Sequence, residues 1–167
     1  MKYTGIGLVA VSLTLTGLFS ARMLKIRLNT VNSVLLFISL LQNEMSFTLS
    51  PIADAVENAG KSPSLYLLDF PCACAEMTKQ GMDFPDAWKT ALEESPVLLK
   101  KQERNQIIQM GQSLSRCDAK GQERIFDYYR AYFTEIFQKA GENRKKYASV
   151  LSAAGILLSA LAAVILI

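Results

Sequence analysis

The chain has 167 residues, of which half are apolar and a fifth are charged, and its formal net charge is +3. This length fits one domain, and the apolar content excludes an intrinsically disordered chain. Residues 22–146 hold 17 basic and 15 acidic side chains, so the middle of the chain is nearly neutral and lacks the basic footprint of a nucleic-acid-binding protein.

An uncharged stretch lies near the start of the chain, over residues 3–21. As a helix, at about 1.5 Å per residue, it is about 30 Å long, which is the thickness of the hydrocarbon core of a bilayer. The cations Arg22, Lys25 and Arg27 follow it directly. The pattern predicts a transmembrane helix over residues 1–21.

The same stretch has a second interpretation as a cleaved signal peptide. Lys2 would be its charged start and Phe19-Ser20-Ala21 its cleavage site. The uncharged stretch is long for a signal peptide, however, and the three cations beyond it resist export. We therefore expect an uncleaved span.

Residues 22–146 have the apolar spacing of helices and no persistent alternation of a strand, so we predict an all-α bundle of six helices. The first runs from Asn29 or Thr30 to about Phe47 and is a central helix of the bundle. Its apolar core, Val34–Leu41, is far shorter than the ~20 residues that a further span would need. We expect a buried core helix here.

Proline marks the starts of the next three helices, because its missing N–H costs nothing in a first helical turn. Ser50-Pro51 predicts a helix that ends at Gly60. Ser62-Pro63 predicts a third helix that runs to about Gln80. The stretch Asp83-Phe84-Pro85 predicts the start of a short fourth helix.

A fifth helix is predicted over about residues 97–115, and Asp118 is the predicted N-cap of a sixth. Apolar and small residues at helical spacing predict the inward faces of these two helices: Leu99, Ile107, Ile108, Gly111 and Leu114 in the fifth, and Ile125, Tyr129, Tyr132, Ile136 and Ala140 in the sixth. The aromatic residues of the sixth helix are expected to be core with one exposed edge.

The chain ends on a second uncharged stretch, residues 147–167, which Arg144, Lys145 and Lys146 precede. No proline interrupts the sixth helix, so we predict that it continues unbroken into a transmembrane helix over residues 147–167. Cations beside a span stay on the cytoplasmic side. Residues 22–146 are therefore predicted to be a cytoplasmic domain between two spans, with both chain ends outside.

Small residues recur along one face of each predicted span, which is the pattern of helices that pack closely in lipid. They are Ala10, Thr14, Gly17 and Ala21 in the first span, and Ala148, Ser152, Gly155, Ser159 and Ala163 in the second. These stripes predict contact between the two spans or with another subunit, so an oligomer is possible.

The sequence lacks histidine and the short motifs that usually mark a catalytic site. The sequence has no histidine, which removes the commonest general base and metal ligand. Cys72, Cys74 and Cys117 lack the spacing of a zinc site, and no phosphate-binding loop or nucleophile motif occurs. We predict no catalytic, cofactor-binding or metal-binding residue, and expect that the chain is not an enzyme.

Short motifs follow one another in a fixed order along the chain: Thr16-Gly17, Leu41, Glu44, Ser50-Pro51, Ala55, Ala87-Trp88, Gly111, Leu114, Asp118, Gln122, Lys146-Tyr147 and Gly155. This ordered set resembles the stage III sporulation protein AB family of endospore-forming bacteria. The resemblance covers nearly the whole chain. Ser115 and Ser159 stand where the family has glycines, which affects loop and packing geometry.

The resemblance implies a subunit of the assembly that joins mother cell and forespore, located in the cell membrane with its middle domain on the mother-cell side. That domain is similar to the cytoplasmic domain of the platform proteins of type II secretion and type IV pilus systems. The implied partners are the cytoplasmic ATPase of the assembly and its other membrane subunits. A further hypothesis is that the unbroken last helix passes the movement of the ATPase to the membrane.

Five residues are candidates for contacts with partners: Glu44, Pro51, Trp88, Asp118 and Gln122. Glu44 and Asp118 have an alternative role as caps or ion-pair partners within the bundle. Trp88 has an alternative place in the core.

Two other functions stay open. One is a helical membrane adaptor of another secretion or division complex, which the genes next to its own would distinguish. The other is a small membrane enzyme, for which the missing histidine and nucleophile are unfavourable.

Overall fold

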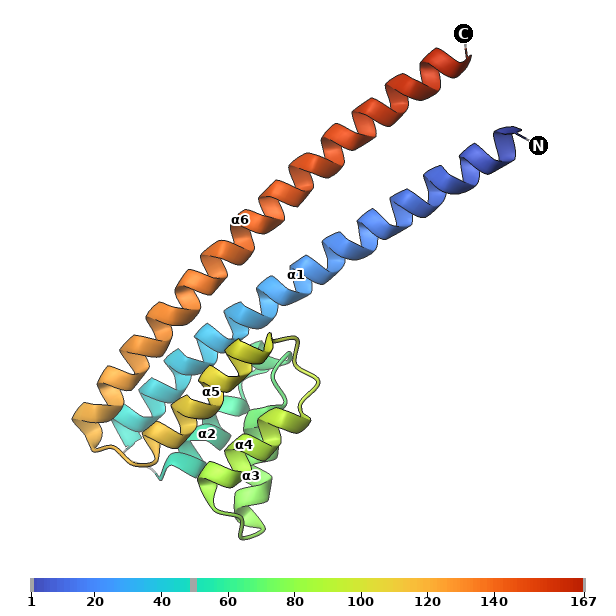
Figure 1. Ribbon diagram of the computed structural model, residues 1–167. Coiled ribbons are helices and arrows are strands. Elements are labelled where there is room, and N and C mark those ends of the chain that lie inside the picture. The colour runs from blue at the N-terminus through green and yellow to red at the C-terminus, as the bar shows by residue number, and fades with distance from the viewer. Residues whose placement is uncertain (1, 49–50, 167) are drawn as a thin grey trace. The chain divides into compact units, whose positions relative to one another are not determined.

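The computed structural model describes the backbone of residues 2–48 and 51–166, and the side chains of residues 22–46, 51–147 and 150. The described backbone contains helices and no strand, which confirms the prediction of an all-α chain. The elements are α1 (Lys2–Thr48), α2 (Ile52–Gly60), the 3₁₀ helix η1 (Pro63–Leu65), α3 (Phe70–Lys79), α4 (Phe84–Glu94), α5 (Lys101–Leu114) and α6 (Ala119–Leu166) (Figure 1).

The chain divides into two compact units. Residues 29–137 form one, which we call the bundle unit, and residues 1–28 with 138–167 form the other, the terminal unit. The helices α1 and α6 each contribute to both units. The predicted boundaries of the spans, at residues 21 and 147, stay predictions.

Within the terminal unit, the described backbone is helical throughout. Apart from Tyr147 and Val150, both predicted spans lie outside the residues whose side chains the structure describes. So do the predicted packing residues Ala10, Thr14, Gly17, Ala21, Ser152, Gly155, Ser159 and Ala163.

Among the described side chains, one stretch of helix is long and apolar enough to cross a membrane. It is Arg22–Ser46, with a mean hydropathy of 1.4. Length and composition alone are weak grounds for a span, because a buried core helix has the same properties. Val34, Phe37 and Leu41 of this stretch are almost completely buried in the core of the bundle unit.

The predicted helix start at Asn29 or Thr30 is wrong, because α1 is continuous from Lys2 to Thr48. No proline or glycine lies between Ala21 and Thr30, so nothing in this stretch stops a helix that is already formed.

The core of the bundle unit gathers aromatic side chains from three helices around Trp88 of α4. The ring centroids of Phe70 and Trp88 lie 5.3 Å apart in an edge-to-face arrangement. Phe37 of α1 lies 6.0 Å from Trp88, with the rings stacked. The second half of α1 is therefore a central core helix, as its apolar spacing predicted.

The predicted third helix is wrong in its middle, because η1 ends at Leu65 and α3 begins only at Phe70. Pro71 explains the break: it has no N–H to donate and disfavours a helical conformation before it. It lies instead in the first turn of α3, as Pro85 does in the first turn of α4. The start of α4 agrees with the prediction.

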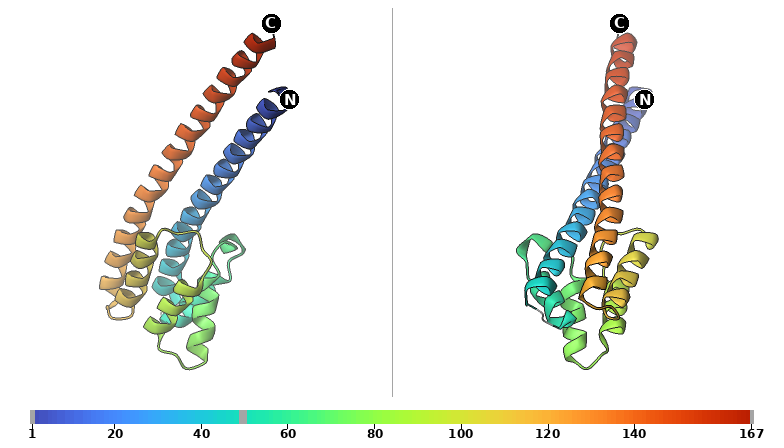
Figure 2. Two further views of the ribbon diagram at one scale, coloured as in Figure 1. Left: turned by 45° about the vertical axis from the view of Figure 1, so that its right-hand side comes forward. Right: turned by 90° about the vertical axis from the view of Figure 1, so that its left-hand side faces the viewer.

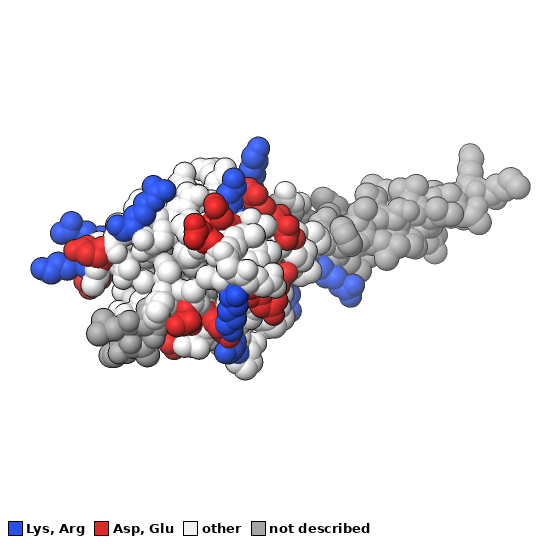
Figure 3. All heavy atoms as spheres, turned by 90° about the horizontal axis from the view of Figure 1, so that it is seen from below, with Lys and Arg blue, Asp and Glu red and all other residues white. Residues whose placement is uncertain are grey.

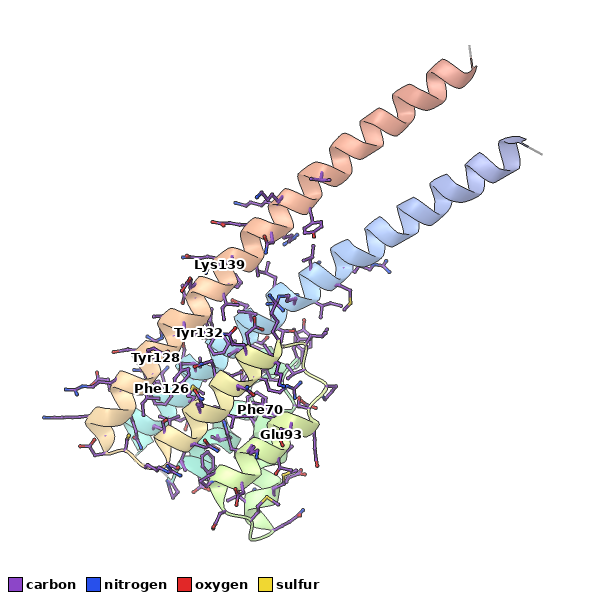
Figure 4. All side chains as sticks on the ribbon, viewed as in Figure 1. Phe70, Glu93, Phe126, Tyr128, Tyr132 and Lys139 are labelled. Atoms are coloured by element: carbon purple, nitrogen blue, oxygen red, sulfur yellow. The ribbon has the colours of Figure 1, made fainter. Side chains whose placement is uncertain are left out.

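The buried face of α6 is rotated from the predicted one. Phe126, Tyr129 and Phe133 are buried, whereas Tyr132 is only partly buried. Tyr128 is 59% exposed, so the aromatic residues form core with one exposed edge, as expected. Phe126, Tyr128 and Tyr132 follow one another along the helix in Figure 4.

Candidate functional site

The bundle unit has two ends. At one end α1 enters the unit and α6 leaves it; at the opposite end α1 ends, α2 begins and α5 turns into α6 (Figures 1 and 2). We call the second end the distal end. Four of the five predicted contact residues belong to its segments: Glu44, Pro51, Asp118 and Gln122.

A cleft of about 290 Å³ lies at the distal end, between the last turn of α1 and the first two turns of α6. Phe126 forms its most deeply buried wall, with 2% of its surface exposed, and Met45 is half-buried. The charged side chains at its rim, Lys120 and Glu123, are exposed. The remaining lining residues are Ser46, Ala119 and Gln122.

Asp118 and Gln122 hold the turn that forms one side of this cleft. The Asp118 carboxylate accepts a hydrogen bond of 2.9 Å from the Gly121 N–H, which caps the start of α6. The Gln122 side-chain amide donates to the carbonyls of Leu114 and Cys117, each at 3.3 Å, which satisfies the end of α5. Both side chains therefore have a structural role, and the exposed Asp118 also faces solvent.

Pro51 lies at the start of α2, one position earlier than predicted. It is the N-cap and not the first helical residue, and its carbonyl accepts hydrogen bonds from Asp54 at 3.0 Å and from Ala55 at 3.1 Å. Its ring is exposed. Glu44, near the end of α1, is half-buried.

Trp88 is the predicted contact residue that the distal end does not include. It is completely buried, and its indole Nε1 donates a hydrogen bond of 2.8 Å to the carbonyl of Ile107 on α5. Of the two roles predicted for Trp88, a partner contact or a place in the core, the structure confirms the place in the core.

Two arginines with structural contacts were missed by the sequence analysis. Arg130 of α6 donates a hydrogen bond to the side-chain carbonyl of Gln42 on α1, one turn inward from the cleft. Its Nε is buried and has no partner among the described residues. Arg104 of α5 donates to backbone carbonyls at the end of α4 and in the following connection. The sequence did offer one signal for Arg130. It directly follows Tyr129, which the helical spacing predicts to be buried.

The surface carries acidic and basic side chains side by side, without a large field of one sign on the face seen in Figure 3. Glu57 is an example, with Lys79 at 2.7 Å and Lys61 at 2.9 Å. Hydrogen bonds from Lys79 and Lys61 lower the pKa of the Glu57 carboxyl below its ordinary value. On this face the charges are therefore balanced locally.

The thiols differ in environment. Cys72 and Cys117 are exposed, whereas Cys74 is buried, and burial raises the pKa of its thiol to about 11. Cys74 is therefore protonated and unreactive at neutral pH. Among the described side chains, no group of three or more carboxylates and thiols is placed to hold a metal ion.

A group of cations flanks each predicted span on the side of the bundle unit, and we call these two groups the cationic collars. Both belong to the terminal unit. Arg22, Lys25 and Arg27 lie in its N-terminal part, and Arg144, Lys145 and Lys146 in its C-terminal part. All except the half-buried Arg27 are exposed.

A family model described as stage III sporulation protein AB matches residues 2–167, which is essentially the whole chain. No curated protein and no solved structure matches the chain significantly.

Proposed function

The chain belongs to the stage III sporulation protein AB family, and from this premise we propose that it is a membrane-anchored platform in the secretion-like complex between mother cell and forespore. In this proposal the bundle unit is cytoplasmic, on the mother-cell side, and docks the ATPase of the complex. The other membrane subunits of the complex are further partners.

The observation that carries the proposal is the length of α6. This helix has 48 residues and runs from the distal end, where it contributes Gln122 and Glu123 to the cleft, to Leu166. At about 1.5 Å per residue it is about 70 Å long. No proline interrupts α6 in the described backbone, and we propose that a displacement at its start is passed along its length.

Anchoring rests on the two uncharged stretches and their collars. Both collars border the residues between the predicted spans, which cover residues 1–21 and 147–167. Cations beside a span favour the cytoplasmic side. We therefore place the bundle unit in the cytoplasm.

We further propose that the ATPase performs the chemistry and that this chain performs none. The absence of histidine from the sequence and the protonated state of Cys74 support this division of roles. The chain would instead bind the ATPase and respond to its movement.

The test of the proposal is the rigidity of α6 between the distal end and the membrane. Two glycines are inserted before Arg144 in one strain, and two alanines at the same place in a matched control. The insertions change length and helical phase equally, but only glycine makes the helix flexible. We expect fewer heat-resistant spores with glycine than with alanine, at equal protein levels in the membrane. Equal spore counts would show that rigid coupling is not needed.

A further inference from the structure

We infer that the two cationic collars together form a binding surface for the headgroups of anionic phospholipids. The inference rests on the membrane anchoring in the proposed function, and it adds the class of lipid that the chain selects. It is carried by the distribution of charge between the two units, by the apolar side chains exposed beside the collars, and by the placement of the collar cations along and around their helices.

The charges of the chain are divided unevenly between the two units. Residues 22–28 and 138–147 of the terminal unit hold seven basic side chains and one acidic side chain. Residues 29–137, the bundle unit, hold ten basic and fourteen acidic side chains. The nearly neutral stretch between the predicted spans therefore combines a net charge of +6 beside the spans with −4 in the bundle unit. A cluster of cations directly beside a span attracts anionic lipid.

Exposed apolar side chains gather in the same segments. The structure describes 18 side chains of the terminal unit and 105 of the bundle unit, yet each unit has four of the eight large apolar side chains that are exposed among them. Those of the terminal unit are Met23, Ile26, Tyr147 and Val150. Three of these directly follow an exposed cation, as Tyr147 follows Lys146. Such pairs suit the membrane interface, where the cation meets phosphate and the apolar group reaches the acyl chains.

The exposed collar cations fit within the depth of one headgroup layer. Arg22 directly follows the first uncharged stretch, and Lys146 directly precedes the second. At about 1.5 Å per residue, Arg22 to Lys25 covers about 4.5 Å of the helix axis, and Arg144 to Lys146 about 3 Å. The headgroup region is roughly 5–8 Å thick on each side of a bilayer. With the predicted spans in the bilayer, these cations are level with the lipid phosphates.

The cations of the second collar point to three different sides of α6. Successive residues of an α-helix are rotated by about 100° about its axis, and Arg144, Lys145 and Lys146 are all exposed. A protein that packs against one face of α6 would meet one or two of them. A layer of headgroups surrounds the helix and reaches all three. The arrangement therefore favours lipid over the surface of a protein partner.

The collar cations lack a counter-charge within the described residues. Arg22, Lys25, Arg144, Lys145 and Lys146 are exposed, and none of them forms an ion pair there. The phosphate of phosphatidylglycerol would supply this charge, whereas the phosphate of phosphatidylcholine is already neutralised by its own ammonium group. The long stems of Lys and Arg let their heads reach the phosphates from any side of the helix. The collars should therefore select the anionic lipid.

Native mass spectrometry of the full-length chain in detergent micelles tests this selection. The chain is mixed with equal amounts of phosphatidylglycerol and phosphatidylcholine that carry the same acyl chains, so only the headgroups differ. We expect several-fold more adducts with phosphatidylglycerol, and a smaller excess as the concentration of ammonium acetate rises, because salt screens exposed charges. Equal numbers of the two adducts would overturn the inference.

Two triple variants of equal net charge locate the binding surface. The collar variant replaces the three cations of the second collar with glutamine, which is a good helix former. The control variant replaces three exposed cations of the bundle unit: Lys89→Gln/Lys101→Gln/Arg124→Gln. We expect the collar variant to lose most of the phosphatidylglycerol excess and the control to retain it. An excess that survives in the collar variant, or that falls equally in both, would show that the collars are not the surface.

Extraction of membranes with sodium carbonate separates this inference from the proposed function. If the unchanged chain stays in the membrane but shows no preference between the two lipids, the collars do not select anionic lipid and the anchored platform remains. If carbonate releases the unchanged chain, the membrane anchoring of the proposed function fails, and the inference fails with it.

Discussion

The indole ring of Trp88 fills the space that a side chain at position 111 would occupy. A Cβ atom added to Gly111 would lie 2.3 Å from Nε1 and 2.4 Å from Cδ1 of Trp88. Because Gly111 leaves this space open, the Trp88 indole lies against α5 and donates its hydrogen bond to Ile107. The close approach of these two residues therefore holds α4 against α5.

We expect the substitution Gly111→Ala to destabilise the bundle unit. Overpacking a core costs about 1–3 kcal/mol, and the better helix propensity of alanine offsets up to ~1 kcal/mol of that cost. Because the added Cβ meets three ring atoms of Trp88, we expect the overpacking to dominate. Urea unfolding of the full chain in detergent measures the change, with fluorescence of the single tryptophan as the probe. Gly141→Ala on α6 is the control, since no atom lies within 4 Å of its added Cβ. Unchanged stability of Gly111→Ala would show that the close approach is not tight.

The same clash predicts coupling between the two positions. Phenylalanine at position 88 is smaller than tryptophan, so Gly111→Ala should cost less in the Trp88→Phe background than in the unchanged chain. Neighbouring residues typically couple by about 0.5–3 kcal/mol. A double-mutant cycle measures this energy from urea curves followed by far-ultraviolet circular dichroism, because Trp88→Phe removes the single tryptophan. Strictly additive effects would contradict direct contact between these positions.

Arg104 is expected to stabilise the connection between α4 and α5. Its guanidinium donates to the carbonyls of Ser95 and Val97 at 3.2 Å, and to those of Leu92 and Glu93. A lysine ammonium is a compact donor without the planar fork, so Arg104→Lys leaves carbonyls unpaired at a cost of about 1–3 kcal/mol. Thermal unfolding measures the loss. The exposed Arg124→Lys is the matched control and should change little.

Asp118 has a cap role and a possible contact role, and two substitutions distinguish them. Asp118→Ala removes the hydrogen bond to Gly121 and should cost about 1 kcal/mol of stability. Asp118→Ser keeps a capping oxygen but removes the charge, so it should restore the stability. Sporulation restored with stability indicates a cap alone. Stability restored without sporulation indicates that a partner binds the carboxylate.

The cysteines report the topology of the bundle unit. Cys72 and Cys117 are exposed and Cys74 is buried, with its pKa raised to about 11 by burial. A membrane-impermeant maleimide at pH 7 should label no cysteine in intact cells and two after permeabilisation. Cys74 should react only when the chain is unfolded. A Cys72→Ala/Cys117→Ala chain is the control and should stay unlabelled in the folded state. Labelling in intact cells would contradict a cytoplasmic bundle.

Local sequence signals predicted most of the helical elements, but neither the continuity of α1 through Asn29 nor the break between η1 and α3. The spacing of apolar residues predicted a helical chain with a central helix over the second half of α1, and Pro85 marked the start of α4 within a residue. The stretch before Arg144 also predicted an unbroken last helix, which α6 is in the described backbone. These signals act through backbone geometry and nearest neighbours, so they are legible without the rest of the fold.

Contacts between distant segments were decided by the tertiary structure. Apolar periodicity shows that α6 has a buried face, but the choice of Phe126 and Phe133 over Ile125 and Tyr132 depends on which helices pack against it. The gathering of Glu44, Pro51, Asp118 and Gln122 at one end depends in the same way on how the six helices pack. The sequence alone thus determined the helical class of the chain and most of its helices, through short-range conformational preferences. Only the packed bundle decided which side chains meet, because burial is a property of residues that are far apart in the chain.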